Sequence, residues 1–223
     1  MKLIEYPDAE MMMIDLANRI AGELNSHLMR HDFASLAVPG GTTPGPVFDT
    51  LSAVDLDWGR VQVMPTDERR VPEDSPRSNL RLLRERLLVD RAARANVVPL
   101  HVEGPDPEAA LAEVDAAVEA VLPLSVVLLG MGEDMHTASL FPGADRLAEA
   151  VASDAPAVMA LNAPGAPEPR VPLTARVLNE AFSKHLLIRG AEKRAALARA
   201  AELSPIEAPI RAVWTDLTVH WAE

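Results

Sequence analysis

The chain has 223 residues, no cysteine, and 33 acidic against 21 basic side chains, which gives a formal net charge of −12. This balance argues against nucleic acid as a partner, because binding a phosphate backbone requires a basic surface. It does not exclude a small phosphorylated ligand, but such a ligand needs a local cluster of cations. Without cysteine the chain has no disulfide, thiol nucleophile or cysteine metal site.

The N-terminus lacks the apolar centre of a signal peptide, and no apolar run approaches the roughly 20 residues that span a bilayer. We therefore expect a cytoplasmic protein that makes no membrane contact. Hydrophobic residues make up 48% of the chain, which is ample for a buried core. Because no linker or repeat interrupts the sequence, we expect residues 1–223 to form a single domain.

The first quarter of the chain predicts a strand, a helix and a second strand that ends in a glycine-rich loop. The strands are expected at 2–6 and 33–38, and Asp8 caps the helix between them. The loop contains Gly40, Gly41, Thr42 and Thr43 and leads into a helix. Glycines, hydroxyls and the N–H groups of a helix start can hold an anion, although the loop could equally be a simple turn. It lacks a P-loop lysine and a dinucleotide fingerprint, so we expect no nucleotide cofactor.

A second polar segment follows the next predicted strand, at 61–64. It reads Thr-Asp-Glu-Arg-Arg-Val-Pro over residues 66–72, directly after a buried strand, where a charge run is otherwise a solvated face. Ser78 or Asn79 can cap the following helix. A strand at 96–100 and an alanine-rich helix at 107–121 are expected next.

Residues 126–143 join a wholly apolar run to a polar loop. Four apolar residues predict a strand that is covered on both faces, as in a parallel sheet. The loop after Gly130 then presents Asp134, His136 and Ser139 near the carboxyl end of that strand, where open α/β sheets bind ligands. The alternative is an ordinary polar turn with a surface histidine.

The last third predicts strands at 158–161 and 185–188 and helices at 175–182 and 192–202. A final strand at 212–221 is expected to be antiparallel or to lie at an edge. Together the elements favour an α/β fold with an open, mostly parallel, Rossmann-like sheet flanked by helices and a small antiparallel edge.

Five motifs in order give the chain a family resemblance over nearly its whole length: PGGTTP at 39–44, DERRVPEDSPRSN at 67–79, LGMGEDMHTASLFPG at 129–143, RVPLT at 170–174, and Gly190 with Lys193. The chain resembles the 6-phosphogluconolactonases, which are related to the glucosamine-6-phosphate deaminases. The resemblance implies a NagB/RpiA-like fold and hydrolysis of 6-phospho-D-glucono-1,5-lactone in the oxidative pentose phosphate pathway. The deaminases carry an Asn-Glu pair after the histidine, which this chain lacks. A deaminase/isomerase and a non-catalytic sugar-phosphate sensor are the alternatives.

Lactone hydrolysis needs a base for water and a cation or donor for the developing oxyanion. His136 is the candidate base, and either Asp134 or Asp67 could orient its imidazole. Arg69 is the candidate cation near the carbonyl. The remaining predicted binding residues, which include the phosphate-holding loop, are Gly40, Gly41, Thr42, Thr43, Arg77, Arg170 and Lys193. We expect no metal, and a monomer or weak homo-oligomer that takes a phosphorylated sugar lactone.

Met135 departs from the family pattern, because lactonases usually have glycine before the histidine. If the backbone there requires a positive φ, methionine costs on the order of 1 kcal/mol. Pro39 is a lesser departure. Both bear on loop geometry more than on the family resemblance.

Overall fold

The computed structural model describes residues 1–101 and 106–223. Its strands, in chain order, are β1 (Lys2–Glu5), β2 (Ala34–Val38), β3 (Val61–Pro65), β4 (Asp67–Arg69), β5 (Asn96–Val97), β6 (Val126–Leu129), β7 (Arg170–Pro172), β8 (Ser183–Arg189) and β9 (Leu217–Ala222). The α-helices are α1 (Ala9–Leu28), α2 (Gly45–Ser52), α3 (Asn79–Arg86), α4 (Pro107–Glu119), α5 (Leu147–Ala150), α6 (Ala175–Asn179) and α7 (Gly190–Ala200). Three short 3-10 helices are η1 (Trp58–Arg60), η2 (Asp90–Arg94) and η3 (Pro209–Val213).

The main sheet has seven strands in the order β1-β9-β8-β6-β2-β3-β5, and every neighbouring pair is parallel. A separate two-stranded sheet pairs β4 with β7 in antiparallel register. The predicted α/β class, with a mostly parallel sheet and a small antiparallel element, is confirmed. Among the described residues, no helix combines the length and apolar character needed to cross a membrane.

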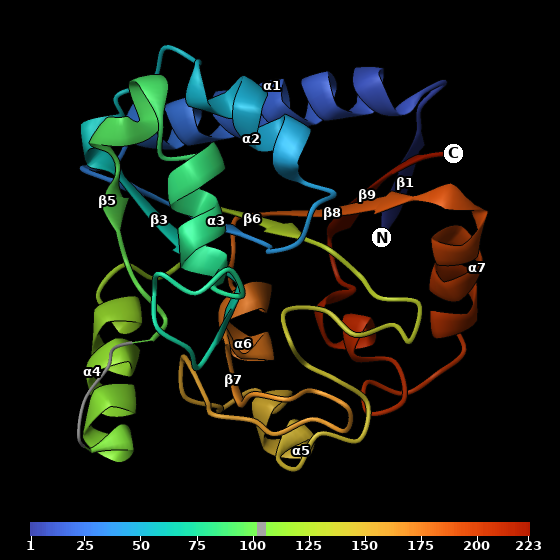
Figure 1. Cartoon of the computed structure of the whole chain (residues 1–223). Coiled ribbons are helices and arrows are strands. Elements are labelled where there is room, and N and C mark those ends of the chain that lie inside the picture. The colour runs from blue at the N-terminus through green and yellow to red at the C-terminus, as the bar shows by residue number, and fades with distance from the viewer. Residues whose placement is uncertain (102–105) are drawn as a thin grey trace.

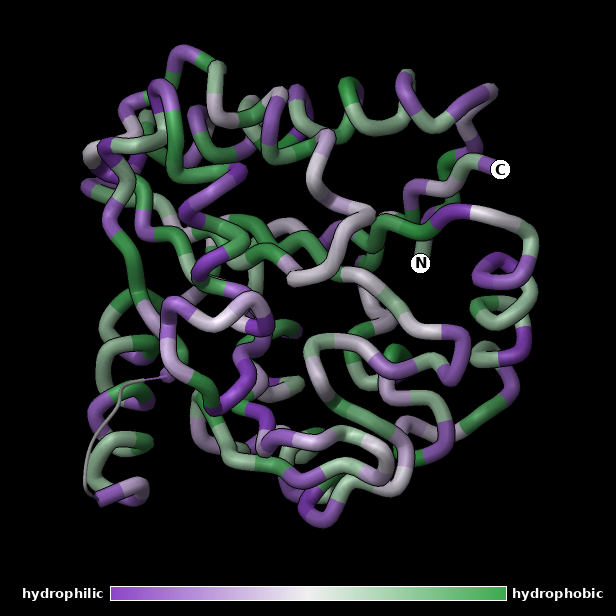
Figure 2. Tube along the Cα trace, viewed as in Figure 1, coloured by the Kyte–Doolittle hydropathy of each residue, from purple (hydrophilic) through white to green (hydrophobic). Residues whose placement is uncertain are grey.

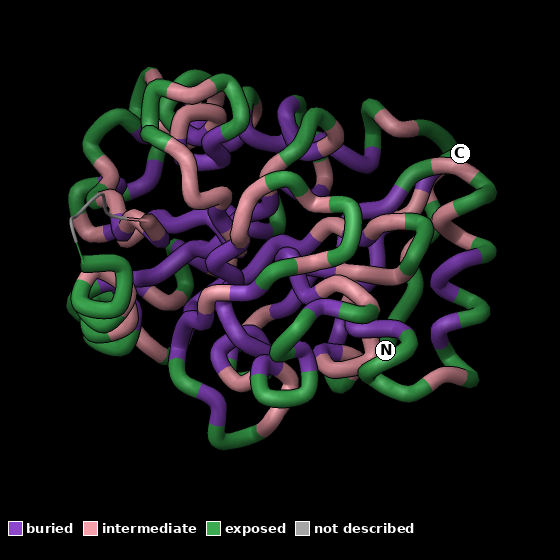
Figure 3. The backbone as a smooth tube through the Cα atoms, turned by 60° about the horizontal axis from the view of Figure 1, so that its bottom comes forward, coloured by how far each residue is buried: buried purple, intermediate pink, exposed green. Residues whose placement is uncertain are grey.

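Helices cover both faces of the main sheet (Figure 1). α1 and α2 lie on one face, and α4, α6 and α7 pack on the other. Hydrophobic segments concentrate along the strands between these layers (Figure 2). Figure 3 shows the same segments as buried, whereas most of α4 is exposed on its outer side.

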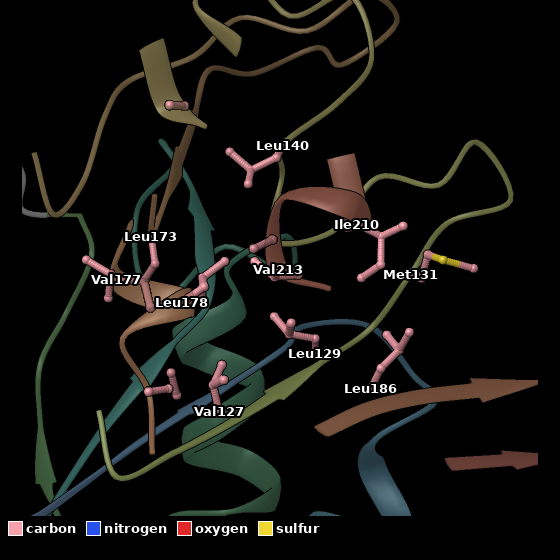
Figure 4. Close-up of a cluster of buried hydrophobic side chains, with 14 of the residues drawn as sticks. Val127, Leu129, Met131, Leu140, Leu173, Val177, Leu178, Leu186, Ile210 and Val213 are labelled. Carbon is pink, nitrogen blue, oxygen red and sulfur yellow. The ribbon is translucent and has the colours of Figure 1, made fainter. Parts of the chain in front are cut away.

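The alternation of β6 explains why its residues are all apolar. Val126 and Leu128 pack in the cluster beneath α1 and α2, whereas Val127 and Leu129 pack in the cluster on the opposite face. Successive side chains of a strand point to opposite faces, so a strand that is covered on both sides has no polar position. In Figure 4, Leu129 points toward η3, where Val213 lies above it, and Val127 lies on the same side of β6.

β2 and β6 are parallel neighbours in the sheet, and the direction in which successive strands are added across the sheet reverses between them. After β2 the chain continues through α2 to β3 on one side, whereas after β6 it continues across the other face toward β8. Such a switch point leaves a crevice at the carboxyl ends of the two strands, because their outgoing loops separate. The glycine loop and the histidine loop therefore begin side by side.

Two strand predictions are wrong. β9 is neither antiparallel nor at an edge, because it pairs in parallel with both β1 and β8. Its polar residue His220 is fully buried and is accommodated by a hydrogen bond to His185 of β8. The predicted strand at 158–161 forms only two isolated bridges, Val158 with Leu173 and Leu161 with Arg170. The segment that follows it, residues 162–172, ends in β7.

Candidate active site

A cavity of about 360 Å³ opens at the switch point between β2 and β6. It is lined by the loops that follow these strands, by β4 and β7, and by the start of α7. The predicted site residues that line it are Gly40, Gly41, Thr42, Thr43, Asp67, Arg69, His136, Arg170 and Lys193. Sequence-distant loops therefore converge on one volume, which is large enough for a sugar phosphate.

His136 lines this cavity, and the carboxylate of Asp134 contacts its imidazole ring. Nδ1 of His136 lies 2.5 Å from Oδ1 of Asp134, and the backbone N–H of His136 donates to the same oxygen at 3.2 Å. A carboxylate at Nδ1 keeps the proton on that nitrogen, so Nε2 of the neutral ring is the nitrogen that can accept one. Asp134 itself is outside the lining and about half exposed.

Asp67, the other candidate partner of His136, is engaged elsewhere. Its carboxylate accepts one hydrogen bond from Ser139 Oγ and another, at 3.3 Å, from Thr66 Oγ1. Between the two carboxylates that the sequence left open, Asp134 is the one in contact with the imidazole. Asp67 instead faces the cavity from β4.

The loop that carries His136 turns twice through left-handed backbone. In the first turn, Met135 N–H donates to Gly132 C=O and Met135 has φ 66°. A Cβ at Gly132 would lie 2.3 Å from Nδ1 of His136, so only glycine fits beside the ring. From the sequence, methionine is expected to be costly at this position if the backbone takes a positive φ, and the backbone of Met135 does so.

The second turn spans Thr137 to Leu140 and places Ser139 toward Asp67. Leu140 N–H donates to Thr137 C=O at 2.8 Å, and both central residues have positive φ, 48° at Ala138 and 58° at Ser139. This is the pattern of a type I′ turn, which normally uses glycine, asparagine or aspartate. Backbone strain of this kind gathers at functional sites.

Two arginines face each other across the small antiparallel sheet. Arg69 of β4 and Arg170 of β7 are direct register partners, and both line the cavity. Like charges placed opposite each other destabilise a ladder. Burial, and then the neighbouring charge of Arg69, lowers the pKa of Arg170. Within the described residues, the buried Nε atoms of both arginines have no hydrogen-bond partner. Two adjacent guanidinium groups with unpartnered donors are suited to bind an anion.

An aromatic ring joins the arginines to the histidine. The Phe141 ring centroid lies 4.2 Å from that of His136, and the Arg170 guanidinium carbon lies 5.9 Å from the same Phe141 ring. Imidazole, phenyl ring and guanidinium thus form one continuous wall. Phe141 was part of a motif in the sequence, but nothing in its spacing indicated this contact.

Lys193 reaches the cavity from the first turn of α7. Its Nζ donates to the backbone carbonyl of Met131 at 2.7 Å, which ties the lysine to the loop after β6. Gly190 opens the helix with φ 82°, a conformation that favours glycine. A lysine near a helix N-terminus opposes the helix dipole, so an anion there would relieve the repulsion.

The glycine loop packs against Asn79 at the start of α3. A Cβ at Gly40 would lie 2.0 Å from Oδ1 of Asn79, so the close approach requires glycine. Asn79 also lines the cavity, although the sequence had indicated it only as a helix cap. The cap is in fact Ser78, whose side chain accepts from the N–H of Arg81.

Arg77 is the predicted binding residue that the structure keeps away from the cavity. It does not line the cavity, and its guanidinium forms an ion pair with Glu168 at 2.5 Å. Its backbone carbonyl, however, accepts from Arg69 at 2.6 Å.

In the described part of the chain, no group of three or more His, Asp or Glu side chains is arranged to hold a metal ion.

The fold and this site define a class: an α/β protein with a cavity at a switch point, where an imidazole–carboxylate pair lies beside two arginines and a lysine. The family described as glucosamine-6-phosphate isomerases/6-phosphogluconolactonase matches residues 7–221. A 6-phosphogluconolactonase of Rhizobium meliloti is 41% identical, covering 100% of this chain and 98% of the relative. One of Mesorhizobium japonicum is 44% identical, covering 97% and 93%.

Solved structures agree with these matches. The crystal structure of a 6-phosphogluconolactonase from Shewanella baltica has a TM-score of 0.94 and 32% identity, covering 100% of this chain and 97% of that one. A monomeric glucosamine-6-phosphate deaminase, at 18% identity and a TM-score of 0.81, shares the fold. The chain belongs to the glucosamine-6-phosphate isomerase/6-phosphogluconolactonase family, which confirms the resemblance stated from its motifs.

Proposed function

We propose that the protein hydrolyses 6-phospho-D-glucono-1,5-lactone to 6-phosphogluconate, a step of the oxidative pentose phosphate pathway. The full-length relatives named 6-phosphogluconolactonase support this assignment. The observation that carries it is the cavity itself, where an imidazole held by a carboxylate lines the same volume as two arginines and a lysine. These are the groups that hydrolysis of a phosphorylated ester needs.

In the proposed mechanism, Nε2 of His136 takes a proton from water as the water oxygen attacks the lactone carbonyl. Asp134 holds the ring and stabilises the imidazolium that forms. Arg69 stabilises the oxyanion. When the bond from the carbonyl carbon to the ring oxygen breaks, the proton on His136 passes to that oxygen and gives the hydroxyl of the product.

The phosphoryl group is proposed to bind between the glycine loop, Arg170 and Lys193. Arginine offers a planar pair of donors and lysine a point charge, so a dianion can be held from two sides. The unpartnered Nε of Arg170 supports this placement, since a buried donor without a partner is costly unless a ligand satisfies it. This cluster also supplies the local positive charge that the acidic chain requires.

The test is His136→Ala. We expect kcat to fall by about 10²–10⁴-fold, the range for loss of a general base, while affinity for 6-phosphogluconate stays near that of the parent. Because these lactones also open unaided, formation of 6-phosphogluconate is measured above the enzyme-free rate. His31→Ala, at an exposed histidine beyond α1, is the matched control and should keep the parent rate. A His136→Ala variant at the parent rate would remove His136 from the mechanism.

The alternatives are separated by the same preparation. A deaminase would release ammonia from glucosamine 6-phosphate, and a sensor would bind sugar phosphates without turning over the lactone. The missing Asn-Glu pair after His136 favours the lactonase. The cytoplasmic location and the monomeric or weakly associated state stay predictions, to be checked by fractionation and by light scattering.

A further inference from the structure

Glu68 is a buried carboxylate beside the cavity that the reaction does not use. Its side chain belongs to β4, is 3% exposed and does not line the cavity. Oε1 accepts from the N–H groups of Arg69 at 2.7 Å and Asn79 at 2.8 Å. Oε2 accepts from Leu80 N–H at 2.8 Å and from Ser78 Oγ at 3.0 Å. Both oxygens are therefore fully engaged.

These four donors explain why a carboxylate is tolerated there. Burying a charge is costly unless hydrogen bonds replace the lost water. Asn79 and Leu80 are the first residues of α3, whose unpaired N–H groups and positive dipole end favour an anion. Glu68 thus fastens the start of α3 to β4, across a gap in sequence that includes the whole 70–77 loop.

The start of α3 in turn holds the guanidinium of Arg69. Nη1 of Arg69 donates to Oδ1 of Asn79 at 3.0 Å and to the carbonyl of Arg77 at 2.6 Å. The Asn79 amide also donates to the carbonyl of Asp67 at 2.7 Å. Both acceptors of Arg69 therefore lie at the helix end that Glu68 secures.

We propose that Glu68 is a positioning residue that aims Arg69 into the cavity by fixing the start of α3. The role of Arg69 toward the lactone carbonyl rests on the proposed function. Without the carboxylate, Asn79 and the Arg77 carbonyl lose their common anchor, and the guanidinium loses its direction. Glu68 acts through Arg69 and touches no substrate.

The test is a double-mutant cycle with Glu68→Gln and Arg69→Ala, read as kcat/KM for 6-phosphogluconolactone. Glu68→Gln keeps the side-chain shape but turns an NH₂ group toward backbone donors. We expect it to lower kcat/KM about tenfold or more in the parent, and less than about twofold when Arg69 is already alanine, because residues that act as a unit are not additive. Equal loss in both backgrounds would show a general structural role and overturn the proposal.

Asp106→Asn is the matched control. Asp106 also caps a helix with its carboxylate, accepting from the N–H groups of Glu108 and Ala109, but at α4, away from the cavity. It should leave kcat/KM unchanged, which separates capping in general from positioning of Arg69. If Glu68→Gln does not fold, Glu68→Asp, which retracts the carboxylate by one methylene, enters the same cycle.

A parent chain with no rate above the enzyme-free control would refute the proposed function, not the role of Glu68. The cycle is then read from the affinity for 6-phosphogluconate measured by calorimetry. Non-additive loss of affinity would support positioning of Arg69 as a ligand-binding group, and additive loss would overturn it.

Discussion

At the scale of single residues, the His136 loop is built from conformations that its side chains disfavour. Met135, Ala138 and Ser139 all have positive φ, and none of them is glycine or asparagine. Each costs on the order of 1 kcal/mol in L residues. The neighbouring hydrogen bonds of Gly132 with Met135 and His136 hold the first of these turns in place. Stability is thus given up where the imidazole must be aimed.

Because the backbone of Met135 is strained, we expect glycine to be more stable than alanine at this position, the reverse of their order inside a helix. We expect Met135→Gly to be more stable than Met135→Ala by about 1 kcal/mol, because alanine keeps the Cβ that a positive φ disfavours. At Ile14, an exposed position inside α1, the order should reverse, with glycine about 1 kcal/mol less stable than alanine. Urea unfolding measures both pairs. Equal stability of the two Met135 variants would mean that the turn is unstrained.

The sequence could predict those site residues whose type and position in the chain indicate a chemical role. Histidine after a glycine turn, and lysine at a helix start, were recognisable from their types and places. Glu68 and Asn79 were not, because their partners are backbone groups of a helix start that becomes adjacent only on folding. Arg77 was expected to bind substrate, yet it lies outside the cavity lining. The catalytic and binding assignments themselves stay predictions.

At the scale of elements, the small antiparallel sheet is the device that concentrates positive charge. β4 and β7 come from distant parts of the chain, and their register sets Arg69 directly opposite Arg170. A sheet of three residues a side that opposes two arginines is poorly stabilised by itself. We expect an anion bound between these two guanidinium groups to offset their repulsion.

Arg170→Gln should therefore preserve or raise the stability of the protein without ligand, but weaken its binding of 6-phosphogluconate. Without ligand we expect its Tm to equal or exceed that of the parent, since the substitution removes a buried charge that lies beside the like charge of Arg69. With 6-phosphogluconate we expect affinity to fall at least about tenfold, the value of one lost charge-assisted hydrogen bond. Thermal unfolding with and without ligand measures both.

Arg84→Gln, on the outer side of α3 with an exposed ion pair to Glu73, is the control and should keep the parent's ligand-induced rise in Tm. The assignment of Arg170 to the phosphoryl group fails if Arg170→Gln shows that same rise.

Element types were largely predictable, and pairing was not. Fully apolar β6 indicated a parallel, doubly covered strand, because no polar position is available there. β9 alternates, which resembles a half-exposed strand, yet it lies inside the sheet with His220 satisfied by another histidine. Periodicity reports how polar each face is, but not that two distant polar side chains will meet.

At the scale of the whole molecule, a partly buried chain of hydrogen bonds joins α1, the residue that follows β1, β9 and β8. Tyr6 donates to Asp15 at 2.5 Å, so its oxygen accepts from Nδ1 of His220 at 2.9 Å. Nε2 of His220 is then left to accept from Nδ1 of His185 at 3.0 Å. Burial raises the pKa of Tyr6 to about 12, with the hydrogen bond to Asp15 adding to the effect.

His220 makes stability depend on pH. Burial, and next the charge of His185, lowers the pKa of His220 from 6.5 to about 3. Below pH 6.5 His220 is protonated in the unfolded chain but stays neutral in the folded chain. The contribution of His220 to the free energy of unfolding is therefore complete above pH 6.5 and is lost as the pH falls toward 3. At pH 5 the loss is about 2 kcal/mol.

We expect His220→Gln to lose less stability than the parent between pH 7 and pH 5, whatever its stability at pH 7. Urea midpoints at the two pH values measure the difference. The exposed His31→Gln serves as control and should follow the parent. If His220→Gln lost as much stability as the parent between these pH values, folding would not lower the pKa of His220.

The inner position of β9 also governs the order of assembly. Lys2 of β1 has its register partner at Thr218, and β9 is the strand that connects β1 to β8. During synthesis β1 leaves the ribosome first but has nothing to pair with until residues 217–222 emerge. We therefore expect β1 to join the sheet late, after β9 has paired with β8.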